Sequence, residues 1–175
     1  MSVRVGIGYD SHRFREGRPL LLGGVEIPDS PGLSGHSDGD AVAHAVIDAL
    51  LGAAAAGDVG KHFPPDDERW KDADSMMLLE RVVGILRQRD LAPRNVDVTV
   101  ICERPKISPR ARAMRQQLSA VLSLPLDCVS VKGKTNEGMG WIGAGEGIAV
   151  LAVATVTSGA SSDSDYHGAT PGIPI

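Results

Sequence analysis

The run from residue 147 to residue 156 constrains the fold more than any other segment of the chain. It consists almost entirely of apolar residues, several of them β-branched, and it follows a glycine-rich stretch. Such a run, without polar alternation, is typical of a strand that is buried within a sheet. We therefore predict a central strand here, in a sheet that is large enough to have an interior.

Shorter apolar or β-branched runs predict the remaining strands, at residues 4–8, 20–22, 25–27, 96–101 and 129–132. Gly23 and Gly24 separate two of these runs, and a two-residue glycine loop is a strong hairpin signal. Helices are predicted from residue 37 or 38 to about 56, from 73 to 88, and from the Pro105 and Pro109 turn to about 122. Residues 58–71 contain Gly60, Pro64 and Pro65 and are expected to form an exposed loop.

This order of elements predicts a single domain of the α+β class (an α/β layer) in which helices pack on one face of a β-sheet. The domain is expected to span residues 1–157. Residues 158–175 are rich in Ser, Gly, Asp and Pro without periodicity, so we expect them to form a disordered tail. Because aromatic residues make up only 3% of the chain, the core must consist mainly of Val, Ile, Leu and Ala.

The charge of the chain excludes some classes of function. Its formal net charge is −4, which argues against a nucleic-acid surface, although a few local cations would suffice to bind a phosphate. No apolar stretch reaches the roughly 18 residues that span a bilayer, and the start of the chain lacks the features of a signal peptide. Cys102 and Cys128 are isolated in the sequence. A cytoplasmic protein with reduced thiols is therefore predicted.

A candidate metal site comes from Asp10, His12 and His44. Side chains two residues apart in an extended chain point the same way, so Asp10 and His12 can converge on one ion, and His44 supplies a third ligand from a helix. One carboxylate and two imidazoles suit zinc and leave a fourth position for water or substrate, although manganese or iron would accept the same ligands. The alternative is that Asp10 caps a turn and the histidines are ordinary surface or core groups.

The surroundings of His44 favour the metal interpretation. At about 100° per residue, Ser37, Asp40, His44 and Asp48 fall on one polar stripe of the predicted helix. This stripe has neither the Lys nor the Glu that a solvent-exposed helix usually carries. Asp48 is a candidate to orient an imidazole or a substrate hydroxyl.

Three segments are candidate phosphate contacts. His36 and Ser37 are expected at a helix N-terminus, which favours anions, but simple capping by Ser37 explains them equally well. The others are Lys106 and the segment 132–137, where cations and a hydroxyl precede Glu137. This carboxylate could hold a hard divalent ion beside a diphosphate. Each segment alone is also compatible with a solvated turn.

Several long motifs, taken in order, resemble one known family. They are GYDSHRF, LLGGVEIP, HSDGDAVAHAVIDALLGAAAAGDVGKHFP, NVDVTVICERPK, VKGKTNEGMGW and GEGIAV. Together they are similar to the 2-C-methyl-D-erythritol 2,4-cyclodiphosphate synthases of the non-mevalonate route to isoprenoid precursors. The resemblance implies conversion of 4-diphosphocytidyl-2-C-methyl-D-erythritol 2-phosphate to the cyclic diphosphate with release of CMP. It also implies a homotrimer with active sites between subunits, one zinc ion per subunit, and magnesium or manganese with the substrate diphosphate.

The resemblance also assigns roles to residues of this chain. Asp10, His12 and His44 match the zinc ligands, Glu137 matches the magnesium ligand, and His36 and Thr135 match groups that stabilise the transition state. The remaining matched or neighbouring positions are expected to contact substrate: Ser37, Asp48, Asp58, Val59, Gly60, Phe63, Asp67, Cys102, Glu103, Arg104, Pro105, Lys106, Ile107, Ser108, Lys134, Asn136 and Trp141.

Three positions depart from the pattern of the family. Pro65 replaces an aspartate of some members, so Asp66 or Asp67 is expected to supply that hydrogen bond. Lys134 and Asn136 flank Thr135 where relatives often carry hydroxyl residues. Ala144 replaces an arginine that is associated with an isoprenoid diphosphate in the central cavity of the trimer, so that ligand is not predicted here. Two alternatives remain open: a zinc phosphohydrolase, and a non-catalytic trimeric protein with a structural metal.

Overall fold

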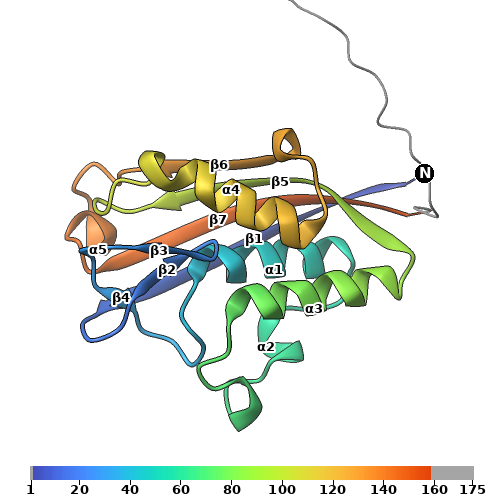
Figure 1. The fold of residues 1–175 in the computed structure, drawn as a ribbon, viewed down its shortest axis with the longest axis horizontal. Helices are drawn as coiled ribbons and strands as arrows, with labels where there is room; N and C mark the ends of the chain where they lie inside the picture. The colour runs from blue at the N-terminus through green and yellow to red at the C-terminus, as the bar shows by residue number, and fades with distance from the viewer. Residues whose placement is uncertain (1, 159–175) are drawn as a thin grey trace, which may run out of the picture.

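Strand β7 (Gly147–Ser158) lies at the centre of a five-stranded sheet, as its apolar sequence predicts. The computed structural model describes residues 2–158, and Figure 1 shows its fold. The strand order is β4 (Gly32–Leu33), β1 (Val3–Arg15), β7, β5 (Leu91–Ile101) and β6 (Val129–Lys134). β7 pairs antiparallel with β1 and with β5, whereas β5 and β6 are parallel. The chain therefore forms one α+β domain with a mixed sheet.

The predicted hairpin is confirmed. β2 (Leu20–Leu22) and β3 (Val25–Ile27) form a separate antiparallel pair around Gly23 and Gly24. Both glycines have positive φ angles, 58° and 72°, which the tight turn between twisted strands requires. Their N–H groups donate to the Asp40 carboxylate at 2.8 and 2.7 Å, so the hairpin is held against the start of α1.

Helices cover one face of the sheet, as predicted. α1 (Ala41–Ala53) packs on β1 and β7, α3 (Ser75–Arg87) packs on α1 and β5, and α4 (Ser108–Leu122) packs on β6 (Figure 1). On β5, Val96, Val98 and Val100 are fully buried under this layer, while the alternate residues Asp97 and Thr99 are only half-buried. This alternation of buried and half-buried residues matches a sheet with one covered face.

Strand β1 is longer than the predicted residues 4–8. It runs to Arg15 and pairs with β7 from Val3, opposite Thr157, to Arg13, opposite Gly147. Asp10 and His12 therefore lie within the strand and not beyond its end. The polar side chains do not end the strand, because the long neighbouring strand supplies hydrogen-bond partners along its whole length.

Helix α1 begins at Ala41, so the prediction of a start at residue 37 or 38 is wrong. Gly39 has a φ of 79°, which a helix cannot contain, and Asp40 is the N-cap. The Asp40 carboxylate accepts the N–H groups of Val42 and Ala43, both at 3.0 Å. The helix ends at Ala53, before the predicted residue 56, and Ala55 has a positive φ of 52°.

The segment 58–71 is more ordered than the predicted loop. It contains a short helix, α2 (Val59–His62), and a 3-10 helix (Glu68–Trp70). Aspartates cap both, since Asp58 accepts the N–H of Lys61 and Asp67 accepts the N–H of Arg69. Among the other elements, a 3-10 helix (Leu126–Cys128) precedes β6 and the one-turn helix α5 (Gly140–Gly143) precedes β7.

The ends of the predicted domain fall near the limits of the described residues. β7 extends through Ser158, one residue past the expected boundary, and the expected tail from 159 to 175 lies outside the described part of the chain. Between residues 2 and 158, the structure contains no helix with the length and hydropathy needed to cross a membrane. Cys102 is buried, Cys128 is half-buried, and both are free thiols.

Candidate active site

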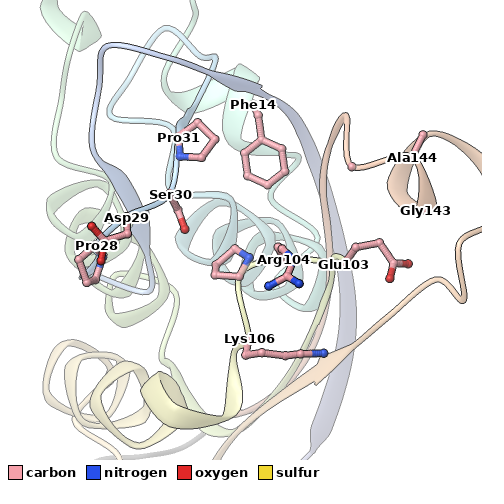
Figure 2. Close-up of a pocket in the computed structure, with 12 residues that line it drawn as sticks. Phe14, Pro28, Asp29, Ser30, Pro31, Glu103, Arg104, Lys106, Gly143 and Ala144 are labelled. Carbon is pink, nitrogen blue, oxygen red and sulfur yellow. The ribbon is translucent and has the colours of Figure 1, made fainter.

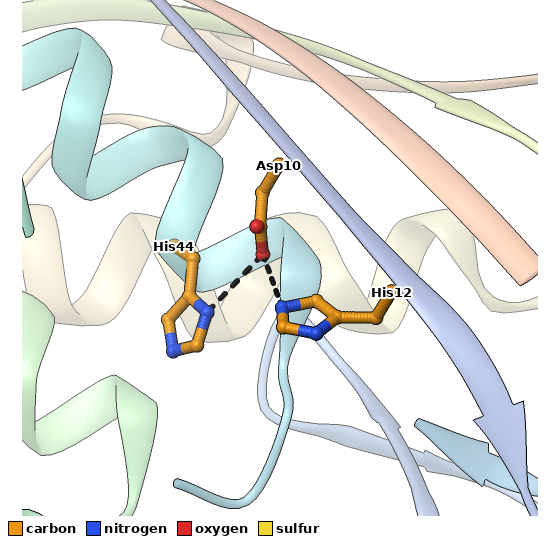
Figure 3. A group of neighbouring side chains, drawn as sticks. All are labelled: Asp10, His12 and His44. Atoms are coloured by element: carbon orange, nitrogen blue, oxygen red, sulfur yellow. Dashed lines mark hydrogen bonds and ion pairs between the residues drawn. The ribbon is translucent and has the colours of Figure 1, made fainter. Parts of the chain in front are cut away.

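The structure brings together the three residues of the predicted metal site. Asp10 and His12 project from β1 and His44 projects from α1, and Figure 3 shows the two imidazoles converging on one carboxylate. Asp10 Oδ2 lies 2.8 Å from His12 Nε2 and 3.1 Å from His44 Nδ1. One ligand atom from each residue lies within 4.8 Å of the other two. This grouping, the metal group, can hold one cation.

Two glycines on β1 set the distance between the strand and the helix. Gly6, Gly8, Asp10 and His12 lie on the same face of β1, which is the face toward α1. A Cβ at Gly6 would stand 2.0 Å from the carbonyl oxygen of Ala49, so any side chain there would push α1 away. The absence of side chains at these positions therefore lets His44 approach Asp10.

The electrostatics of the metal group favour a negative carboxylate. Burial would raise the pKa of Asp10, but the hydrogen bonds and charges of His12 and His44 outweigh it and lower the pKa to about 2. Burial would likewise lower the pKa of His44, but the hydrogen bond to Asp10 and the nearby carboxylates raise it. A cation bound here would compete with a proton for the His44 nitrogen that faces Asp10.

The donor atoms fit a metal ion. His12 Nε2 is buried 2.8 Å from the Asp10 carboxylate, and no other polar group among residues 2–158 is its hydrogen-bond partner. A lone pair on this nitrogen and the carboxylate oxygen can therefore bind the same cation. Two imidazoles and one carboxylate form the kind of three-ligand set that catalytic zinc sites use.

Asp48 has a different partner from those proposed for it. One carboxylate oxygen accepts the N–H of Val59 at 2.7 Å, which ties α1 to the start of α2. Burial raises the pKa of this carboxyl. The far nitrogen of His44 instead faces two hydroxyls, those of Ser37 and Ser75, at 3.1 and 3.0 Å. Of these two, Ser75 was not predicted from the sequence as a site residue.

His36 and Ser37 lie in the turn before α1 and not at its N-terminus. The first N–H groups of the helix bind Asp40, so the expected anion site at that helix end is wrong. Ser37 is buried with its hydroxyl at His44. His36 Nε2 is also buried and lacks a hydrogen-bond partner within the described chain, so it remains available to a substrate.

The residues expected to line the methylerythritol pocket lie on and beside α2. Asp58 caps this helix, Val59 and Gly60 form its first turn, and Phe63 is buried with its ring 5.0 Å from the ring of Trp70 at an interplanar angle of 81°. The Asp67 side chain binds Arg69, whose guanidinium lowers the pKa of that carboxyl. Substrate contacts by these residues stay a prediction.

The predicted nucleotide contacts form a second group, the nucleotide group, where β5 and β6 end side by side. A hollow of about 100 Å³ is lined by Gly133 and by predicted contacts only: Cys102, Pro105, Lys106, Ile107, Ser108, Lys134 and Thr135. Glu103 Oε1 accepts the N–H groups of Asn136 and Gly138 at 2.9 and 3.2 Å, which joins the two segments. Thr135 donates its hydroxyl to Glu137 at 2.9 Å. Burial raises the pKa of Cys102 to about 11.

A larger hollow of about 620 Å³ adjoins the nucleotide group. Figure 2 shows Phe14 and Pro31 across it from Lys106, with Arg104 between them and Gly143 and Ala144 at one side. Pro105 and Lys106 line both hollows, whereas Arg104 lines only the larger one. Neither hollow is lined by any of the three metal-group residues.

Trp141 lies apart from both hollows. It is an exposed residue of α5 and lines a third hollow, of about 440 Å³, with Tyr9, Ser11, His12 and Arg13 of β1. Trp141 therefore does not line the hollows of the nucleotide group, and its role in substrate binding stays a prediction.

Comparisons with known proteins agree on one family. The profile of the YgbB family matches residues 3–157. The 2-C-methyl-D-erythritol 2,4-cyclodiphosphate synthase of Salinibacter ruber is 55% identical over 156 residues, which cover 89% of this chain and 99% of that protein.

Solved structures give the same result. A 2C-methyl-D-erythritol-2,4-cyclodiphosphate synthase in its CDP-bound form is similar with a TM-score of 0.81 and 38% identity, over 88% of this chain and 100% of that one. The bifunctional IspDF protein of Campylobacter jejuni is similar with a TM-score of 0.87 and 39% identity. The match covers 90% of this chain but only 42% of that longer protein.

Proposed function

This chain belongs to the YgbB family of 2-C-methyl-D-erythritol 2,4-cyclodiphosphate synthases, and we propose that its metal group and its nucleotide group are the two halves of the active site. It acts in the non-mevalonate pathway as a CMP-releasing lyase. Its substrate is 4-diphosphocytidyl-2-C-methyl-D-erythritol 2-phosphate, whose 2-phosphate displaces CMP from the diphosphate. The free cysteines agree with the cytoplasmic location proposed for it.

The single observation that carries this proposal is the convergence of Asp10, His12 and His44 from β1 and α1 (Figure 3). We assign zinc to this group, and magnesium or manganese to Glu137, whose lone carboxylate suits a hard cation that retains water. When bound, the two ions act as Lewis acids that neutralise charge on the phosphoryl oxygens. The residues of the chain align the two phosphates for the reaction.

The roles of the chain's own residues follow from their positions. His36 carries a buried, unsatisfied Nε2 that can donate to a phosphate oxygen. Lys106 lies exposed at the junction of two hollows, where its charge can attract the diphosphate. Thr135 has a hydroxyl that can turn from Glu137 to a phosphoryl oxygen as charge develops there.

The finer proposal is a homotrimer with active sites between subunits. The uncovered sheet face is unusually apolar for a surface, since the following residues are at least 38% exposed: Val3, Val5, Ile7, Tyr9, Leu151 and Val153. A contiguous apolar face of this kind is typical of an interface between subunits. We propose that in this trimer the metal group of one subunit forms an active site with the nucleotide group of a neighbour.

The test is incubation of the purified protein with the cytidyl substrate, followed by mass analysis of the products. We expect CMP and the cyclic diphosphate in equal amounts, and loss of both after treatment with a chelator. Orthophosphate or a linear diphosphate would instead indicate a zinc phosphohydrolase. Absence of turnover by a protein that binds zinc and CDP would indicate a non-catalytic metal protein. His44→Ala should abolish zinc loading, and Lys106→Ala should leave it intact while weakening substrate capture.

A further inference from the structure

Ser75 is a buried polar residue with no role in the chemistry derived above. It is the first residue of α3, and its exposed fraction is 0%. Its hydroxyl oxygen lies 3.0 Å from His44 Nε2, which is the ring nitrogen that faces away from Asp10 (Figure 3). A hydroxyl in full burial beside a metal-ligand imidazole requires an explanation, because burial of a polar group is costly unless its hydrogen bonds are defined.

Asp38 determines which atom receives the hydroxyl proton of Ser75. The Asp38 carboxylate accepts the backbone N–H of Ser75 at 3.0 Å and also accepts the Ser75 hydroxyl in a short hydrogen bond. A carboxylate only accepts hydrogen bonds, and its contact with Ser75 is short, so the single hydroxyl proton of Ser75 points to Asp38 and not to Ser37 Oγ, which lies 3.4 Å away. Toward His44, Ser75 can then act only as an acceptor.

The proton count fixes the tautomer of His44. Because Ser75 Oγ accepts, His44 Nε2 must carry a hydrogen, and in a neutral imidazole the other nitrogen then has a free lone pair. That other nitrogen is Nδ1, which lies 3.1 Å from Asp10 Oδ2. Ser37 Oγ, at 3.1 Å from Nε2, accepts the N–H of Gly39 with one lone pair and can accept the same His44 hydrogen with the other.

We propose that Asp38 and Ser75 are positioning residues of the metal site: Asp38 orients the Ser75 hydroxyl, which holds His44 with its Nδ1 lone pair directed at the ion. This inference rests on the metal site proposed above. Asp38 belongs to the HSDGD segment and binds Ser75 at the start of α3. This segment therefore helps to orient His44 in addition to capping α1. Partners that orient a ligand imidazole typically contribute 10- to 100-fold to metal affinity, here as an order-of-magnitude expectation.

The chain offers a matched control for a purely structural role. Asp74 is the N-cap of the same helix, α3, and accepts the N–H of Met76 at 2.8 Å on the surface. Asp74→Ala therefore removes a cap from the same helix end without touching His44. If Ser75 only stabilises α3, then Ser75→Ala and Asp74→Ala should affect metal binding equally.

The experiment measures Zn²⁺ affinity of the full, metal-stripped chain by competition with a chromophoric chelator. We expect Ser75→Ala to bind Zn²⁺ at least about 10-fold more weakly than wild type. The affinity of Asp38→Asn should lie between those of wild type and Ser75→Ala. The affinity of Asp74→Ala should stay within about twofold of wild type. Equal affinities of Ser75→Ala and Asp74→Ala would overturn the proposal. If wild type and His44→Ala bound Zn²⁺ equally, the metal site itself would be wrong, which is a distinguishable failure.

A spectroscopic readout covers variants that fold poorly. In ¹⁵N-histidine-labelled wild type loaded with Zn²⁺, long-range ¹H–¹⁵N spectra report which nitrogen of each imidazole is protonated. The chain has only five histidines, so His44→Gln assigns the signal. We expect His44 to carry its hydrogen on Nε2. A hydrogen on Nδ1 in the Zn²⁺-loaded wild type would exclude the proposed orientation without the use of any variant at Ser75.

Discussion

Gly8 of β1 lies so close to α1 that a Cβ at this position would stand 1.9 Å from the carbonyl oxygen of Ala45. Ala45 directly follows the metal-group residue His44, and Gly8 lies two positions before Asp10 on the same strand face. The contact between the two backbones therefore fixes the distance across which a strand carboxylate and a helix imidazole can share one cation.

Gly8→Ala should damage both stability and metal binding. The added methyl group must push α1 from the sheet, which we expect to lower the free energy of unfolding by about 3 kcal/mol, as for overpacked cores. It should also weaken Zn²⁺ binding by at least about 10-fold, because His44 moves with the helix. Urea unfolding and chelator competition measure the two effects.

Gly84→Ala is the control for that substitution. Gly84 lies within α3, and apart from its chain neighbours and the nearby backbone of that helix, no described atom approaches within 4 Å of the position of its missing Cβ. Alanine should stabilise this helix by about 1 kcal/mol and leave Zn²⁺ affinity unchanged. If Gly8→Ala bound Zn²⁺ as tightly as Gly84→Ala, close backbone approach would not be what positions the site.

Metal-free protein should lose stability in acid through Asp10. The folded-state pKa of this carboxyl, about 2, lies below the ordinary value of 3.8, so its contribution is present above pH 4 and is lost as the pH falls toward 2. The shift corresponds to about 2 kcal/mol. The difference in unfolding free energy between wild type and Asp10→Asn should therefore shrink between pH 5 and pH 3. If the stability difference between wild type and Asp10→Asn stayed constant over this range, the lowered pKa of Asp10 would not be its cause.

The two cysteines should differ in reactivity. Burial raises the pKa of the Cys102 thiol to about 11, so little reactive thiolate exists at pH 8, whereas Cys128 is only half-buried. In the native protein, iodoacetamide should label Cys128 more than about 10 times faster than Cys102 by peptide mass analysis. The rates should become similar in urea. Equal labelling rates of the two cysteines in the native protein would show that the buried Cys102 readily becomes exposed to the reagent.

Two elements of the fold can be predicted from short sequence patterns alone. The central strand β7 follows from an apolar run, and the hairpin follows from Gly23 and Gly24. The sequence alone places the start of α1 too early, because Ser37, Asp38 and Asp40 are all good caps. Only the hairpin N–H groups and the φ of Gly39 select Asp40. Ser75 was missed because it contacts His44 across 31 residues of sequence, and no periodicity connects two separate helices.

The open sheet face should be required for assembly. Ile7 is 69% exposed in the single chain, and in a trimer built on this face a charge there would be buried without a partner. Ile7→Lys should therefore shift the protein from trimer to monomer in light scattering after size exclusion. Met77, an exposed apolar residue of α3, is the control, and Met77→Lys should remain trimeric. A trimeric Ile7→Lys variant would place the interface elsewhere.

Mixing two inactive variants should restore activity if each active site is shared between subunits. His44→Ala removes a metal ligand, and Lys106→Ala removes the cation between the two hollows. Each variant alone should be inactive or nearly so at low substrate concentration. When the two are unfolded, mixed in equal amounts and refolded together, about a quarter of the sites should combine an intact metal group with an intact nucleotide group from a neighbour. CMP release should then recover to about that fraction of the wild-type rate. If the two groups of one subunit served the same site, every site in the mixture would carry one lesion, and no activity would return.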